Sequence, residues 1–109
     1  MCAFHILHSN DIGQITNCSS CNHFKVCFGN CLLFLNTTQF RAFNKHINNL
    51  YDRHYADMLL TDEKLFIHTE SDNLMIALST DELKNLCELL NKSFIMLQLN
   101  TIINPKTEQ

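Results

Sequence analysis

Apolar residues recur at every second position on both sides of the dipeptide Gly29-Asn30, between Phe24 and Leu35. Glycine and asparagine tolerate the positive φ angles of a tight turn, so this pattern predicts an antiparallel hairpin. Six residues then share one face of the hairpin: Phe24, Val26, Phe28, Cys31, Leu33 and Leu35. The opposite face is also largely apolar, which predicts a hairpin that is central in its sheet or covered on both sides.

Two later segments have the spacing of three and four residues that is typical of amphipathic helices. They follow Asn36-Thr37-Thr38-Gln39 and Ser79-Thr80-Asp81-Glu82, which both have the form of a capping box. The buried side of the first helix is predicted to consist of Phe40, Phe43, Ile47, Leu50, Tyr51 and Met58. The buried side of the second is predicted to consist of Leu83, Leu86, Cys87, Leu90, Phe94 and Leu97.

The segments that begin at Phe24 and Ile67 match each other at an offset of 43 residues. Each one reads strand, turn, strand, helix, and a further hairpin with its turn at Asn10-Asp11 precedes them. We interpret the match as a duplicated ββα unit whose halves share a sheet; a chance pairing of two common units is the alternative. The predicted fold class is α+β, an N-terminal β-hairpin followed by two ββα units, with antiparallel sheets and both helices packed on one side.

The chain of 109 residues is long enough for one domain and too short for two. Within that single domain, 1–109, the patterns give an N-terminal hairpin over 1–17 and a first ββα unit over 23–58. The second ββα unit covers 64–103, and a polar, frayed tail covers 104–109.

Charge and composition disfavour several classes of function. The formal net charge is -3, the sequence pI is about 6.0, and the eight lysines and arginines are scattered, so no nucleic-acid-binding surface is predicted. The N-terminus does not resemble a signal peptide, and the longest apolar stretch is interrupted by polar residues, which together predict a cytoplasmic protein without membrane spans. The sequence holds only two glycines and no catalytic grouping, so it favours a structural or protein-interaction module over an enzyme.

The candidate chemistry lies in the pair Cys18 and Cys21, whose Cys-x2-Cys spacing lets a turn chelate one tetrahedral ion. In a reducing compartment cysteines indicate metal, redox chemistry or packing rather than disulfides. A turn at Asn10-Asp11 would place Ala3 opposite Cys18 and bring the chain start to the same end of the sheet. We therefore predict a structural zinc site whose ligands are Cys2, His5, Cys18 and Cys21, with His23 as the substitute for His5.

Two alternatives to zinc stay open for this pair. It can be a metal-free thiol pair, or it can serve a thiol-based redox or metal-transfer protein. A thioredoxin-like site needs its Cys-x2-Cys at the start of a helix, whereas a strand is predicted to follow Cys21. The remaining cysteines Cys27, Cys31 and Cys87 are interpreted as core residues.

The second predicted helix carries another apolar stripe on the side opposite its core-facing stripe: Leu89, Met96, Leu99 and Ile103. The N-terminal hairpin or the tail can cover this stripe, or a second copy of the chain can. Because the tail is polar, we favour a homodimer through the C-terminal helix.

The pattern Cys18-Ser19-Ser20-Cys21, followed by Phe28-Gly29-Asn30, by Leu33 and Leu35 and by a helix cap with Phe40, resembles a small uncharacterised family of Bacteroidota. The likeness extends from Cys2 to Leu97. The resemblance implies a domain of unknown function with a bacterial, cytoplasmic origin, and it brings no catalytic residues. Cys27 and Cys31 depart from it, because apolar residues are expected at both positions.

Overall fold

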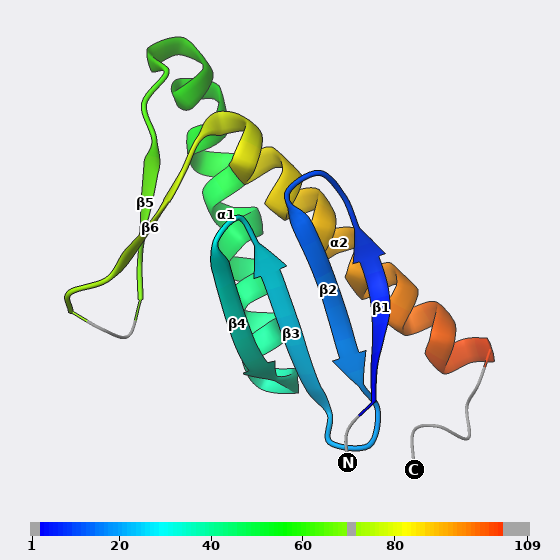
Figure 1. Cartoon of the computed structure of the whole chain (residues 1–109). Helices are drawn as coiled ribbons and strands as arrows, with labels where there is room; N and C mark the ends of the chain where they lie inside the picture. Colours follow the sequence, from blue (N-terminus) through cyan, green and yellow to red (C-terminus); the bar gives the residue numbers. More distant parts are fainter. Residues whose placement is uncertain (1–2, 70–71, 104–109) are drawn as a thin grey trace.

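The computed structural model describes residues 3–69 and 72–103, with side chains as far as Asn100. The fold is α+β and contains a four-stranded antiparallel sheet, a separate two-stranded sheet and two long helices (Figure 1). The elements follow one another as β1 (Phe4–Ser9), β2 (Gly13–Cys18), β3 (His23–Phe28), β4 (Cys31–Asn36), α1 (Thr37–Thr61), β5 (Leu65–His68), β6 (Met75–Leu78) and α2 (Thr80–Ile103).

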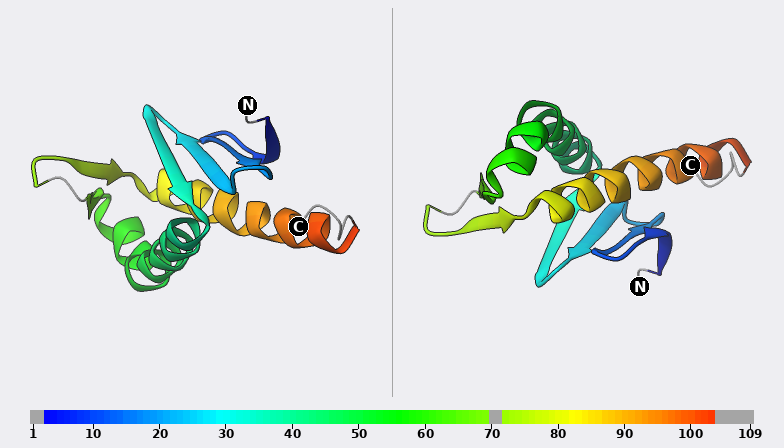
Figure 2. Two further views of the ribbon diagram at one scale, coloured as in Figure 1. Left: turned by 90° about the horizontal axis from the view of Figure 1, so that it is seen from below. Right: turned by 90° about the horizontal axis from the view of Figure 1, so that it is seen from above.

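The four-stranded sheet has the strand order β1-β2-β3-β4, and both helices cover the same face of it (Figure 2). The predicted register of the β3–β4 hairpin is confirmed: Phe28 pairs with Cys31, and Val26 pairs with Leu33. The prediction that this hairpin is central in its sheet or covered on both sides is wrong. Strand β4 is an edge, and on the open face Leu32 and Phe34 are 61% and 55% exposed.

The core lies between the four-stranded sheet and the helices, and phenylalanines connect its layers. The ring of Phe40 on α1 stacks on Phe24 of β3, with ring centroids 4.1 Å apart, and on Phe94 of α2, at 5.8 Å. The predicted apolar stripes of both helices take part, because every predicted residue either is buried or packs against the buried cluster. The stripe spacing therefore identified the core-facing residues of both helices, although Leu89 of α2 is buried as well.

The N-terminal hairpin has a different register from the predicted one. Cys18 lies opposite Phe4 rather than Ala3, and the pairing shifts at a β-bulge between Ile6 and His8. The turn is set by Asn10, whose backbone N–H donates to the carbonyl of Gly13 (2.9 Å) and whose side-chain oxygen accepts from the N–H groups of Ile12 and Gly13. The bulge directs Leu7 into the core, where it is 4% exposed.

Side chains of α2 hold this hairpin in place. The Asn10 amide donates to the carbonyl of Asn85 (2.9 Å) and to the carboxylate of Glu88 (3.0 Å). The hydrogen bond from Asn10, followed by the charge of Lys92, lowers the pKa of Glu88. Long-range contacts of this kind decide the hairpin register, and the local sequence does not reveal them.

The two ββα units do not share a sheet, so that part of the duplication hypothesis is wrong. Among the described residues, β5 and β6 pair only with each other, antiparallel, with Ile67 opposite Ile76. The repeat is nevertheless visible where the helices cross. Asn48 on α1 and Asn91 on α2, which are 43 residues apart, each donate an amide hydrogen bond of 3.0 Å to the other's side-chain oxygen. Equivalent positions of the two units thus meet at a local two-fold arrangement.

Both predicted capping boxes are present. Asn36 accepts from the N–H of Gln39 (2.8 Å) while the Gln39 side chain accepts from the N–H of Asn36 (2.9 Å). Ser79 and Glu82 exchange the same two bonds at 3.2 and 2.8 Å. Each box satisfies two N–H groups that the first turn of a helix would otherwise leave without a partner.

We expect Asn36→Ala and Ser79→Ala each to lower the free energy of unfolding by about 1 kcal/mol, because each removes a cap. Urea denaturation followed by circular dichroism measures this change. Thr38→Ala is the control, since Thr38 is an exposed residue of the same first turn, and it should have almost no effect. An equal loss in the control would show that the caps do not contribute specifically.

Candidate metal site and interaction surfaces

The Cys-x2-Cys pair lies in the turn between β2 and β3. Cys18 is the last residue of β2 and is fully buried, whereas Cys21 is half-buried. The turn is closed by Asn22, which has a left-handed φ of 56° and donates its N–H to the carbonyl of Cys18 (2.8 Å). Cys18 Sγ is 3.1 Å from Ser20 Oγ. The turn keeps both sulfurs at one end of the sheet, as chelation requires.

His23 is the donor that the register places beside Cys18. The two residues are direct cross-strand partners, and such partners project from the same face of a sheet. The Nδ1 atom of His23 is 2.9 Å from the carbonyl oxygen of Cys21, and its ring stacks on Phe34 with centroids 4.9 Å apart. A carbonyl only accepts hydrogen bonds, so Nδ1 carries the proton and Nε2 of the neutral ring carries the lone pair.

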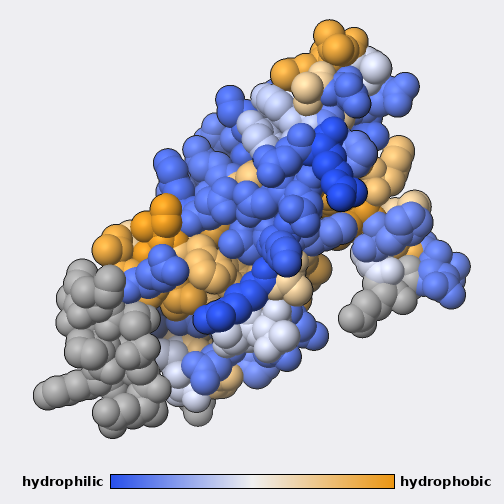
Figure 3. Space-filling view, turned by 180° about the vertical axis from the view of Figure 1, so that it is seen from behind, coloured by the Kyte–Doolittle hydropathy of each residue, from blue (hydrophilic) through white to orange (hydrophobic). Residues whose placement is uncertain are grey.

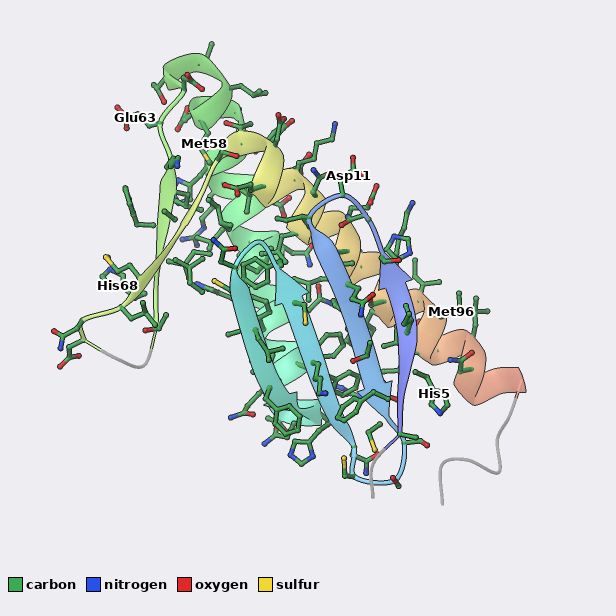
Figure 4. All side chains as sticks on the ribbon, viewed as in Figure 1. His5, Asp11, Met58, Glu63, His68 and Met96 are labelled. Carbon is green, nitrogen blue, oxygen red and sulfur yellow. The ribbon has the colours of Figure 1, made fainter. Side chains whose placement is uncertain are left out.

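His5, the predicted fourth ligand, lies on the other face of the sheet. It pairs with Asn17, one residue before Cys18, and successive side chains of a strand point to opposite faces. Figure 4 shows its ring projecting from β1 on the side of α2. Cys2 lies outside the described residues. Among the described residues, no group of three or more His, Cys, Asp or Glu side chains is arranged to hold a metal ion.

Comparison with known proteins identifies the family of the chain but no activity. A model described as a family of unknown function (DUF6686) matches residues 1–105. The chain belongs to this DUF6686 family. No curated protein and no solved structure matches it. The expectation of a domain of unknown function is thereby confirmed, and the family brings no substrate, cofactor or partner.

Two of the other described cysteines of this DUF6686 chain, Cys31 and Cys87, pack against or in the core; the interpretation of Cys27 as a core residue is wrong, because it lies on the open face beside Leu32. Cys27 and Cys31 are half-buried on opposite faces of the β3–β4 hairpin, since Cys31 pairs with Phe28 and Cys27 with Leu32. Cys87 is buried at the helix crossing, where its thiol donates to Asn48 Oδ1 (3.2 Å). Burial is the main cause that raises the pKa of Cys87, so this thiol is protonated and unreactive at neutral pH.

The polar pair at the crossing, Asn48 and Asn91, was not singled out from the sequence. The signal was nevertheless available, because the two residues are separated by the repeat offset and lie in the helical part of each unit. A polar residue at equivalent positions of both helices indicates a specific contact between them. Such a half-buried pair favours one packing of α1 against α2 over others.

Part of the predicted interaction stripe on α2 is buried against other elements of the same chain. Leu89 is fully buried, because the strands β1 and β2 pack on this part of α2, so it cannot belong to an outer surface. The prediction that Leu89 belongs to a dimer surface is therefore wrong. The N-terminal hairpin covers this residue, which was the alternative to a dimer. Met96 and Leu99 remain 40% and 44% exposed. The side chain of Ile103 lies outside the described residues.

No helix in the described ranges is long and apolar enough to cross a membrane. Figure 3 shows apolar atoms gathered at two separate places on one face of the molecule. One lies over the C-terminal part of α2, where Ile95, Met96 and Leu99 are exposed. The other lies at the opposite end, over the last turn of α1 and the β5–β6 hairpin.

Proposed function

We propose that this chain is a small structural or protein-interaction module in which a zinc ion fastens the start of the chain to the sheet. The ligands in this proposal are Cys18, Cys21, His23 and Cys2. Cys18, Cys21 and His23 do not surround one point in the structure, so the proposal requires both cysteine side chains to turn toward His23 when the ion binds. The observation that carries it is the direct cross-strand pairing of His23 with Cys18 beside the Cys-x2-Cys turn. His23 replaces His5 as the fourth ligand because His5 projects from the opposite face.

The chemistry of the donors fits a structural zinc site. Two thiolates and an imidazole are ligands that zinc prefers, and a structural site needs four of them. The Nδ1 of His23 already donates to the Cys21 carbonyl, which is the outer hydrogen bond that zinc-binding histidines commonly make. That bond leaves Nε2 as the atom that binds the ion.

The covalent chain keeps Cys2 within reach of this turn. Cys2 is two residues before Phe4, and two residues span at most about 7 Å. Phe4 is the direct partner of Cys18, and such Cα atoms are about 5 Å apart. A ligand at position 2 would therefore tie the N-terminus to the end of β2, with a binding free energy of about 10 kcal/mol or more.

Metal analysis of protein purified without added zinc tests the proposal. We expect one zinc per chain in the wild-type protein and nearly none in Cys2→Ser, Cys18→Ser, Cys21→Ser and His23→Ala. His5→Ala and Cys27→Ser are matched controls that should keep the metal. Wild-type protein without zinc would overturn the proposal. Retention of zinc by His23→Ala together with its loss from His5→Ala would overturn the choice of His23.

The alternative function, thiol redox or metal transfer by Cys18 and Cys21, is distinguished by thiol reactivity. A strand follows the pair, so the pair does not stand at the start of a helix as a thioredoxin-like site requires. In a structural zinc site both thiols react with a thiol reagent only after a chelator is added. A redox pair reacts immediately at neutral pH, with or without the chelator.

A further inference from the structure

The end of the molecule formed by α1 and the β5–β6 hairpin exposes large apolar side chains on adjoining elements. We call this the distal surface; it consists of Leu59, Leu60, Phe66, Leu74 and Met75. Leu60 is 85% exposed and Phe66 is 60% exposed. Figure 3 shows the corresponding apolar atoms at the tip of the molecule and beside it. Clusters of this kind on a small protein indicate a contact with another chain.

The same end contains a strand edge without a partner strand. Within the described part of the chain, β5 pairs with β6 on one side and with no strand on the other. The internal repeat shows what covers the equivalent edge. By the 43-residue offset β5 corresponds to β3, and the outer edge of β3 is paired along its whole length with β2, from Cys18–His23 to Gly13–Phe28. The counterpart of β6 is β4, and its outer edge is open in the first unit as well.

Strand β5 has few of the features that protect natural edges from pairing. Leu65–His68 contains neither proline nor a lysine or carboxylate, and the charged residues Asp62, Glu63 and Lys64 all lie before it. Its sheet has two strands of four residues each, and isolated two-stranded sheets are marginally stable in water. A further strand on this edge would satisfy its outward N–H and C=O groups and stabilise the hairpin.

We propose that this edge binds a second copy of the chain, with β5 pairing antiparallel to β5 of the partner around a two-fold axis. A strand edge is self-complementary in this arrangement, so one surface serves both copies. In a register that pairs odd-numbered residues of one β5 with odd-numbered residues of the other, Leu65 and Ile67 stay on the helix side in both copies. The same register keeps the two Phe66 side chains together on the outer face. The result is a continuous four-stranded sheet in the order β6-β5-β5-β6.

The residues around β5 carry charges of both signs, so two copies of this surface can attract each other. A hollow of about 340 Å³ lies between the end of α1 and the start of β5, with Met58, Leu60 and Leu65 among its lining residues. Its rim carries Lys64 and His54 together with Asp57 and Glu63. Figure 4 shows Met58 and Glu63 at this junction. A two-fold copy can place Lys64 near Asp57 or Glu63 of the other copy, whereas a partner of one charge sign would repel at least one of these groups.

The alternative surface for self-association is the exposed part of α2 with Met96 and Leu99. It lies on a helix, so it offers apolar contact without a strand edge of its own. The distal surface is favoured because it combines the free edge with exposed apolar side chains and charges of both signs. Variants of both surfaces belong in the same experiment.

Sedimentation equilibrium of the full chain tests the proposal. We expect a dimer that Phe66→Lys and Leu60→Lys each weaken at least tenfold in dissociation constant, because each places a charge in an apolar contact. Leu60 is the most exposed of these side chains, so its variant should fold normally. Met96→Lys is the matched control and should leave the dimer intact. A monomeric wild-type protein, or a dimer that only Met96→Lys dissociates, would overturn the proposal.

Hydrogen exchange of the β5 amides distinguishes a dimer formed by β5–β5 pairing from a dimer formed by apolar contacts elsewhere. If β5 pairs with its copy, its outward amides exchange more slowly as the protein concentration rises, and Leu60→Lys removes that dependence. Exchange rates in β5 that do not change with concentration, in a protein that is a dimer, would show that the copies meet elsewhere.

Discussion

Phe40→Ala is expected to lower the free energy of unfolding by about 4 kcal/mol. Phe40 is fully buried, and its ring lies between Phe24 of the sheet and Phe94 of α2. Alanine would leave a cavity where the sheet and both helices meet, and none of the three can move into it without losing other contacts. Small domains are stable by only about 5–15 kcal/mol, so the variant should melt roughly 20 °C lower.

Thermal and urea denaturation at one fixed protein concentration measure this loss. Phe34→Ala is the matched control, because Phe34 is also an aromatic residue with a stacked partner but is 55% exposed on the open face. The control should cost about 1 kcal/mol or less, since little apolar surface returns to water. Similar losses in both variants would show that the stack around Phe40 is not the centre of the core.

Features with a local or periodic signal were predictable from the sequence. The register of β3 and β4 followed from the turn Gly29-Asn30 and alternating residues, and both helix starts followed from their capping boxes. In each case the residues that determine the structure are within a few positions of one another. Short-range physical chemistry was sufficient there.

Features decided by distant contacts were not predictable. The register of β1 depends on the bulge at Leu7 and on the bonds from Asn10 to α2. A slip of one residue moves every side chain of a strand to the other face. For that reason the sequence placed His5 with the cysteines, whereas the pairing of β2 with β3 places His23 there. The separation of β5–β6 from the main sheet likewise depends on how α1 and α2 cross.

Gly13→Ala is expected to destabilise the protein by about 3 kcal/mol or more. Gly13 begins β2 opposite Phe28, and a Cβ atom there would lie 1.8 Å from the carbonyl oxygen of Cys27 and 2.8 Å from Phe28 Cα. Both neighbours are backbone atoms of the central strand β3, so they cannot move aside as a flexible side chain would. The substitution must push β2 away from β3 and disturb the docking of the whole N-terminal hairpin.

The other glycine of the chain provides the matched control for this experiment. A Cβ at Gly29 meets no atom within 4 Å, so Gly29→Ala adds only the strain of a φ of +55°, about 1 kcal/mol. If close approach of the strands is the reason for glycine at position 13, urea denaturation will rank Gly13→Ala well below Gly29→Ala in stability. The reverse ranking would mean that β2 can shift to accept a methyl group and that the turn at Gly29 is the more sensitive part of the sheet.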